Sequence, residues 1–364
     1  YYNAITGFTR YLPAYRPIHA KRDLARLGWI DSESLRNERV VEKLGDAFSE
    51  ELSYPIHPIT CPKKSSNQLN VLLIVVDALR PEMVNSEITP TIDRFKEKAI
   101  RFNNHYSGGT SSRMGAFSIF YGIPTTYWRT FHDNQRSSIL IDKFLDHQYQ
   151  VLGISSAGFG SPTVLDRTAF ARVKDLNVKR LSSLDKESNR LVTKKWLEWL
   201  SQYKSERPFF SYLHYDPPMN AIDTIDFNLI PKDFLTKETD EHLKEVGRYT
   251  QSILFVDSEI DTILESLNHD GLLKETVIII TSDHGYELND YDTGYYGHAS
   301  NYSRAQLKTP FFMLWPNREP KEFTQRTSHN DIVPTLLTEV LGCSNPASDY
   351  SSGFNLFSGE SWEF

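Results

Sequence analysis

Asp283 and His284 directly follow an apolar run, Val277 to Ile280, within the hexapeptide SDHGYE. Such a run is typical of a buried strand, and burying an unpaired charge costs roughly several kcal/mol, so the carboxylate at its end needs a partner. Carboxylate oxygen and imidazole nitrogen are both good metal ligands. The two residues therefore indicate either a metal site or a set of hydrogen bonds that closes the strand.

A second carboxylate, Asp77, ends another apolar run, Val71 to Val76. Ligands of open parallel sheets bind outside the carboxyl ends of the strands, so we expect Asp77 and Asp283 to point toward the same rim. Together with His284 they would supply three of the four ligands of a four-coordinate metal site.

The segment SGGTSSRMGAF at residues 107–117 is expected to supply the fourth ligand. We expect Thr110 to lie at the start of a helix, where free backbone N–H groups and the positive end of the dipole favour a phosphate or sulfate group. A metal-bound hydroxyl there could act as a nucleophile. Thr110 is the first candidate, and Ser111 and Ser112 are alternatives. The competing interpretation is that one of these hydroxyls only caps the helix.

From Asn70 onward, segments with strand character alternate with helical segments. This alternation predicts an α/β fold with a mostly parallel central sheet flanked by helices. A long helix is expected at about 240–268, because apolar residues recur along it at helical spacing. Residues 68–364 would form this domain, after an N-terminal arm at 1–60 that is partly helical. The expected strands are 70–76, 149–155, 208–214, 276–281 and 309–314.

Three segments resemble the alkaline phosphatase/sulfatase superfamily: TPTIDRF (89–95), AIRFNNHYS (99–107) and the stretch from Tyr249 to SDHG. The order of the motifs also agrees, since an early strand ending in Asp precedes the nucleophile loop, the long helix, SDHG and a later Gly-His pair. The resemblance covers about residues 68–345 and implies that the hydroxyl at 110 does more than cap a helix.

The resemblance implies that one divalent ion, Mg²⁺, Mn²⁺ or Zn²⁺, is held by four residues: Asp77, Thr110, Asp283 and His284. It further implies a catalytic Thr110, and a role for His298, in YGHAS, in contacting the phosphoryl group or a second metal. A histidine in a surface loop is the alternative interpretation of His298.

The sequence resembles the lipid-headgroup transferases of this superfamily more than its sulfatases. The sulfatase motif C-x-P-x-R does not occur, whereas Thr110 and Gly122 have the twelve-residue spacing of phosphoethanolamine transferases. A two-metal phosphatase would add an Asp-x-x-x-His pair, but here Asp216 is followed by Asn220. A second metal site is therefore not expected.

The first thirty residues combine cations with aromatic residues in a protein whose net charge is −7. Cations next to rings of this kind suit the surface of an anionic membrane, although an arm packed on its own domain is the alternative. The cations expected to bind lipid are Arg10, Arg16, Lys21, Arg22 and Arg26. The acidic net charge argues against nucleic acid as a partner.

The arm TGFTRYLPAYRPIHAKRDLARLGW and the core GGTSSRMG together resemble the periplasmic portion of a family of Gram-negative inner-membrane proteins. This resemblance implies a place on the periplasmic face of the inner membrane, anchored by transmembrane segments upstream of this chain. Cys61 and Cys343 could pair in such an oxidising compartment, or stay free in a reducing one.

By the same resemblance, the favoured function is regulation of lipopolysaccharide and outer-membrane lipid homeostasis. The partners would be lipid A (lipopolysaccharide) or cardiolipin, the membrane surface and other inner-membrane regulatory proteins. The alternative is a metal-dependent phosphatase or headgroup phosphotransferase that uses Thr110 as nucleophile, with weak activity possible beside a regulatory role.

Overall fold

A computed structural model describes residues 52–62, 68–204, 206–235, 240–360 and 362. The predictions for the arm, including Arg10, Arg16, Lys21, Arg22 and Arg26, lie outside the described residues. The boundary between the arm at 1–60 and the domain from 68 stays a prediction. In the part of the chain that the structure describes, no helix is long and apolar enough to cross a lipid bilayer.

A seven-stranded sheet forms the centre of the domain, in the order β10-β2-β9-β6-β1-β5-β4. The four strands β6, β1, β5 and β4 are parallel, and β9 runs antiparallel to both β6 and β2. The prediction of an α/β fold with a mostly parallel sheet is confirmed. The strands are β1 (Asn70–Val76), β2 (Ile100–Phe102), β4 (Gln150–Ser155), β5 (Phe209–Tyr215), β6 (Thr276–Thr281), β9 (Phe311–Leu314) and β10 (Glu322–Phe323).

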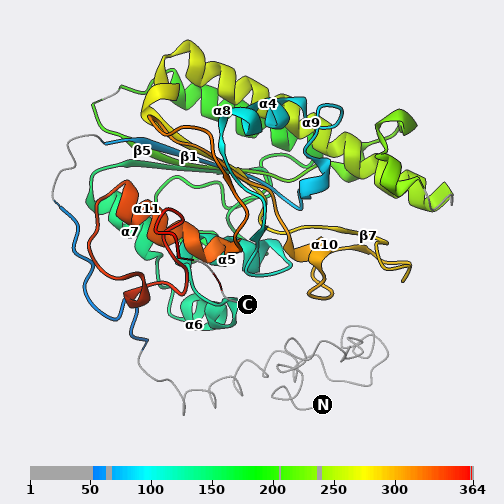
Figure 1. Cartoon of the computed structure of the whole chain (residues 1–364). Helices are drawn as coiled ribbons and strands as arrows, with labels where there is room; N and C mark the ends of the chain where they lie inside the picture. The colour runs from blue at the N-terminus through cyan, green and yellow to red at the C-terminus, as the bar shows by residue number, and fades with distance from the viewer. Residues whose placement is uncertain (1–51, 63–67, 205, 236–239, 361, 363–364) are drawn as a thin grey trace, which may run out of the picture. The chain divides into compact units, whose positions relative to one another are not determined.

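Helices cover both faces of this sheet (Figure 1). On one face the long helix α9 packs against α8 and α4, and on the other α5 packs against α7 and α11. The helices begin and end as α4 (Pro90–Lys98), α5 (Ser112–Tyr121), α6 (Trp128–Asp133), α7 (Ile139–Asp146), α8 (Asp185–Leu200), α9 (Asp240–His269), α10 (Arg304–Leu307) and α11 (Ile332–Glu339). Because both faces are covered, the strands β1 and β6 are buried along their whole length, which explains their unbroken apolar sequences.

Two small strand pairs lie outside the main sheet. The antiparallel pair β7 (Glu287–Leu288) and β8 (Tyr296–Gly297) follows the SDHG motif. In the parallel pair of β3 (His105–Tyr106) and β11 (Thr327–Ser328), β3 directly precedes the nucleophile loop. Both pairs therefore flank the segments that the sequence associates with chemistry.

Residues 56–61 are fastened to the end of the domain. Cys61 forms a disulfide with Cys343, which settles the choice between paired and free cysteines. The Ile56 N–H also donates to the Asp349 carbonyl at 2.7 Å. Two residues of this segment are thus tied to residues nearly three hundred positions later.

Candidate metal and phosphoester site

Asp77 and Asp283 leave neighbouring strands at the same edge of the sheet. β1 and β6 pair in parallel, with Val75 opposite Thr281, so the residues that follow each strand emerge together. Asp283 is fully buried, and its Oδ1 accepts the N–H groups of Ala78 (3.1 Å) and His284 (2.9 Å). Its Oδ2 has no hydrogen-bond partner. A buried carboxylate oxygen without a donor is what a metal ligand leaves open for its ion.

His284 lies against both carboxylates. Its Nε2 is 3.5 Å from Asp77 Oδ1 and 3.7 Å from Asp283 Oδ2. Its Nδ1 is 2.7 Å from the Gly285 carbonyl, which can only accept, so Nδ1 carries a proton and Nε2 is the ring nitrogen that faces the carboxylates. Metal-binding histidines are commonly oriented in this way. The structure therefore brings three of the four predicted ligands together.

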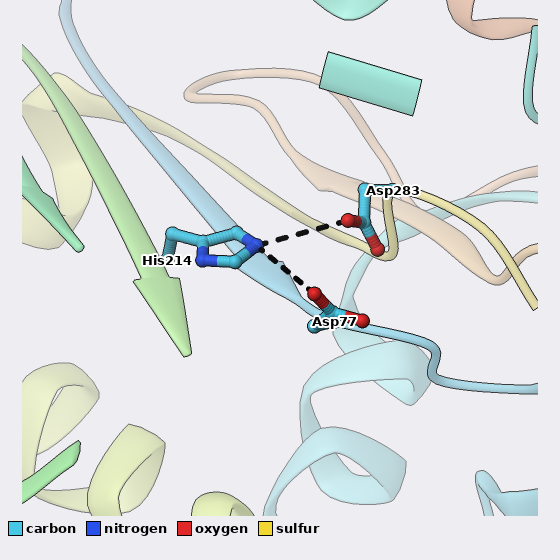
Figure 2. A group of neighbouring side chains, drawn as sticks. All are labelled: Asp77, His214 and Asp283. Atoms are coloured by element: carbon cyan, nitrogen blue, oxygen red, sulfur yellow. Dashed lines mark ion pairs between the residues drawn. The ribbon is translucent and has the colours of Figure 1, made fainter. Parts of the chain in front are cut away.

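His214, near the end of β5, is a member of this cluster that the sequence analysis missed. Its Nε2 is 3.8 Å from Asp77 Oδ2 and 3.8 Å from Asp283 Oδ2, and the three side chains point toward one another (Figure 2). One donor atom from each of the three lies within 4.8 Å of the others, as in a metal site. The available signal was a histidine close to the end of the strand predicted at 208–214.

The charges of these groups are coupled through burial. Burial alone would raise the pKa of Asp283, but His284 and His214 outweigh it and lower that pKa. Burial alone would lower the pKa of His214, but the carboxylates of Asp283 and Asp77 outweigh it and raise that pKa. The cluster thus holds negative charge that attracts a proton or a cation.

The nucleophile loop lies beside the cluster, but its helix starts later than expected. α5 begins at Ser112, and the side chain of Ser111, at the N-cap position, makes no capping hydrogen bond. Ser112 Oγ donates to Asp77 Oδ2 at 2.9 Å and lies 3.3 Å from His284 Nε2. Thr110 is buried, and its carbonyl accepts the Ala299 N–H at 2.7 Å. The hydroxyl seen on the carboxylate is therefore that of Ser112, while Thr110 connects the loop to the segment that carries His298.

α5 packs closely on the SDHG segment, and Gly115 makes this approach possible. A Cβ atom at Gly115 would lie 2.0 Å from the Asp283 carbonyl oxygen. No side chain fits in that space, so the first turn of α5 and the carboxyl end of β6 are fixed relative to each other. This contact holds the hydroxyls at 110–112 next to Asp283.

His298 lies at the cluster and is half-buried. Its ring is 4.3 Å from that of His284, centroid to centroid, and its Nδ1 is buried without a hydrogen-bond partner. Burial, followed by the nearby His284, lowers the pKa of His298. This position agrees with a residue that faces a reacting group, whereas a histidine in an open surface loop would be exposed.

Buried polar contacts fix the loop that carries His298. Glu287 Oε2 accepts from Asn301 Nδ2 (3.0 Å), Ser303 Oγ (3.1 Å) and Gln306 Nε2 (2.8 Å). Asp290, earlier in the loop, forms a bidentate ion pair with Arg80, which follows β1, and both N–O distances are 2.9 Å. Contacts made by residues before and after His298 in the sequence therefore hold its loop in place.

A cavity of about 620 Å³ adjoins the site, and Asp77, Ser112 and His214 are part of its lining. Its other walls include residues 157–158, 160–163 and 178–180, and Asp216. Burial, together with the charge of Asp77, raises the pKa of Asp216 to about 6. Asp216 forms an ion pair with Arg180 at 2.5 Å, and Asn220 is exposed, which gives no support to a second metal at this pair.

The comparison with protein families gives the class of the molecule. The model of the sulfatase family matches residues 69–341, and this chain belongs to that family, within the alkaline phosphatase/sulfatase superfamily. Members of this superfamily usually use a divalent metal ion. The donor set on the strand ends, with its open carboxylate oxygen on Asp283, fits such an ion.

Among curated proteins, the chain is 28% identical over 98% of its length to the inner membrane protein YejM of Salmonella typhimurium. It is 27% identical over 99% of its length to an uncharacterised protein of Haemophilus influenzae. In both cases the chain spans 56% of the relative.

Solved structures show the same fold at low identity. A phosphonate monoester hydrolase from Silicibacter pomeroyi has a TM-score of 0.59 at 18% identity, with 79% of this chain and 76% of that chain covered. The lipoteichoic acid synthase LtaP of Listeria monocytogenes has a TM-score of 0.58 at 17% identity, with 81% and 80% covered.

Proposed function

We propose that this chain is the periplasmic domain of a bacterial inner-membrane protein, and that its α/β domain acts on phosphoesters with the help of one divalent metal ion. The observation that carries the enzymatic part is the convergence of Asp77, Asp283 and His284 beside a loop of hydroxyl residues. The likeness to YejM over almost the whole chain supports the inner membrane, and the Cys61–Cys343 disulfide supports an oxidising compartment such as the periplasm.

In this proposal Asp77, Asp283, His284 and Thr110 would hold the ion, which would supply positive charge to stabilise the negative charge of the reacting phosphoester. The Thr110 oxygen gives its proton to His298 and forms a bond to phosphorus while the bond to the leaving oxygen breaks, and water then hydrolyses the phosphothreonine. His298, whose lowered pKa leaves the ring neutral and able to accept, passes that proton on to the leaving oxygen. Ser112, which hydrogen-bonds Asp77, is the alternative nucleophile.

Hydrolysis of p-nitrophenyl phosphate by purified protein tests this mechanism. We expect activity that a chelator abolishes and that falls at least a hundredfold in Thr110→Ala, with Ser112→Ala as the matched variant two residues away. Full activity in Thr110→Ala together with loss in Ser112→Ala would move the nucleophile to Ser112. Activity of the wild type that survives chelation would overturn the metal-dependent mechanism.

A second function, regulation of lipopolysaccharide and outer-membrane lipid balance, is favoured by the extent of the likeness to YejM, which includes the arm. We propose that Arg10, Arg16, Lys21, Arg22 and Arg26 bind lipid A or cardiolipin, and that other inner-membrane regulatory proteins are partners. Each cation near an anionic surface contributes roughly 1 kcal/mol, so five give a few kcal/mol before ordering costs. Arginine also pairs with phosphate through two donors at once.

Co-sedimentation with liposomes tests the arm. We expect the protein to prefer cardiolipin-containing over zwitterionic vesicles, and the preference to weaken as salt rises. Reversal of Arg16, Arg22 and Arg26 to Glu should remove it. The matched control reverses three cations of α8, Arg190, Lys194 and Lys195, with the same change in charge. Equal loss of liposome binding in both triple variants would mean that only the net charge of the protein matters. Unchanged binding in the arm variant would contradict the proposal.

A further inference from the structure

We propose that His214 is an additional ligand of the metal ion, so that the site has two imidazoles and two carboxylates and selects a transition metal such as Zn²⁺ over Mg²⁺. This inference rests on the proposed metal-dependent function, whose ligand set it extends. It concerns a residue on β5, a strand that contributes none of the ligands expected from the sequence.

The distances around His214 suit coordination. Two ligands that each lie about 2.1 Å from an ion are about 3.4 Å apart in a tetrahedral site. His214 Nε2 is 3.8 Å from one oxygen of Asp77 and 3.8 Å from Asp283 Oδ2, and His284 Nε2 is 3.5 and 3.7 Å from oxygens of the same two residues. The two imidazoles thus lie at similar distances from the carboxylates, with His214 nearer Asp77 Oδ2 and His284 nearer Asp77 Oδ1.

An independent observation comes from Asp283 Oδ2. This atom is fully buried, lacks a hydrogen-bond donor, and lies 3.8 and 3.7 Å from the Nε2 atoms of His214 and His284. Both separations are too long for hydrogen bonds. A cation between them would satisfy the carboxylate oxygen and both nitrogens at once.

The orientation of the His214 ring also supports coordination of a metal ion. Its Nδ1 lies 3.3 Å from Ser155 Oγ, whose hydroxyl also contacts the Gly158 carbonyl at 3.5 Å. If the Ser155 proton is directed to that carbonyl, Oγ accepts from His214 Nδ1, and Nε2 presents its lone pair to the cluster. An outer partner on Nδ1 is the usual arrangement for a metal-binding histidine.

Two imidazoles change the preferred metal. Mg²⁺ takes oxygen ligands and retains several waters, whereas imidazole suits zinc, copper, iron and nickel. Asp77 and His214 line the 620 Å³ cavity, so an ion that they share would be accessible to a substrate from that side.

X-ray absorption at the zinc edge of the loaded wild-type protein provides the direct test, because the scattering counts bound imidazoles without any substitution. Two imidazoles support the proposal, and one overturns it while leaving the metal-dependent function intact. A wild-type protein that binds neither zinc nor magnesium in equilibrium dialysis would overturn the proposed function together with this inference.

Variants give a second readout. We expect His214→Gln to weaken zinc binding at least a hundredfold and magnesium binding less than threefold, so that the ratio of the two affinities falls. His284→Gln should act in the same direction. His105→Gln is the matched control, because it removes a fully buried imidazole that is bonded to Thr327. Thermal melting establishes that each variant is folded.

Affinity alone does not separate a ligand from a neighbour, since loss of an outer partner also weakens metal binding 10–100-fold. The Co²⁺-loaded protein resolves this point in its visible spectrum. Loss of an imidazole ligand in His214→Gln should change the band positions, as in His284→Gln. Bands at the wild-type positions, with weaker binding only, would make His214 a positioning residue and overturn the proposal.

Discussion

Asp257 and Asp283 are both buried carboxylates, but their surroundings differ. Asp257, on α9, has both oxygens occupied, because they accept the N–H groups of Thr91 and Ile92, each at 2.9 Å, in the first turn of α4. Asp283 has one oxygen occupied by backbone N–H groups and one without a donor. Both side chains are about 1% exposed or less, so burial does not distinguish them.

The difference separates structural stabilisation from function. Asp257 places negative charge at a helix N-terminus, where orphan N–H groups and the dipole favour it, and thereby fastens α4 to α9. Asp283 keeps an unsatisfied oxygen, which costs stability in the folded protein. A fold retains such a cost most readily where the open oxygen binds something, and a metal ion fits its neighbours.

The largest expected effect comes from Asp283→Asn. We expect the affinity for zinc to fall at least a hundredfold, because a charged oxygen is lost from the centre of the cluster. In chelator, the free energy of unfolding should stay equal or rise, since the substitution removes a buried charge. Metal competition and urea unfolding measure the two quantities. Destabilisation of the metal-free variant by more than about 2 kcal/mol would mean that the carboxylate is structural.

The converse is expected for Asp257→Asn. The free energy of unfolding should fall by about 2 kcal/mol, because an amide presents one acceptor and leaves a backbone N–H of α4 unpaired. Zinc affinity should match the wild type. The control is Asp261→Asn, one helical turn away, which removes the more exposed ion pair with Arg94. It should lower the free energy of unfolding by less than about 0.5 kcal/mol. Loss of metal binding in Asp257→Asn would remove the distinction between the two carboxylates.

A third carboxylate, Asp290, extends the comparison to a cationic partner. Burial would raise its pKa, but the hydrogen bonds and charge of Arg80 outweigh burial and lower it. The ionised group therefore stabilises the fold above its unfolded pKa of about 3.9, and this contribution is lost as the pH falls through the folded pKa. We expect Asp290→Asn to cost about 1 kcal/mol at pH 7, since the pair is partly exposed.

Urea unfolding of wild type and Asp290→Asn between pH 7 and pH 3 measures the contribution of ionised Asp290 to the free energy of unfolding. The difference in free energy between the two proteins should be constant down to about pH 5 and shrink below it. A difference that grows in acid would contradict the lowered pKa. Metal affinity should change less than in Asp283→Asn, because Asp290 acts on the His298 loop through its pair with Arg80.

Local sequence determined much of the framework. The run Val71 to Val76 is strand β1, and the helix predicted at 240–268 is α9, because the number and spacing of apolar residues specify buried strands and amphipathic helices without knowledge of their neighbours. The same reasoning placed Asp77 and Asp283 on one rim, since parallel strands end at a common edge. The start of α5 was expected near Thr110, but it lies at Ser112.

Only the tertiary structure decided which strands are neighbours. His214 lies 137 positions after Asp77, and it meets that carboxylate because β5 pairs with β1 in the order β6-β1-β5. No periodicity within β5 indicates this, since its residues are buried on both faces and a histidine among them has no local signature. The contact of His298 with His284 and the Cys61–Cys343 disulfide were decided in the same way. Apolar patterns are properties of a segment, whereas a site assembled across strands depends on the packing that orders the whole sheet.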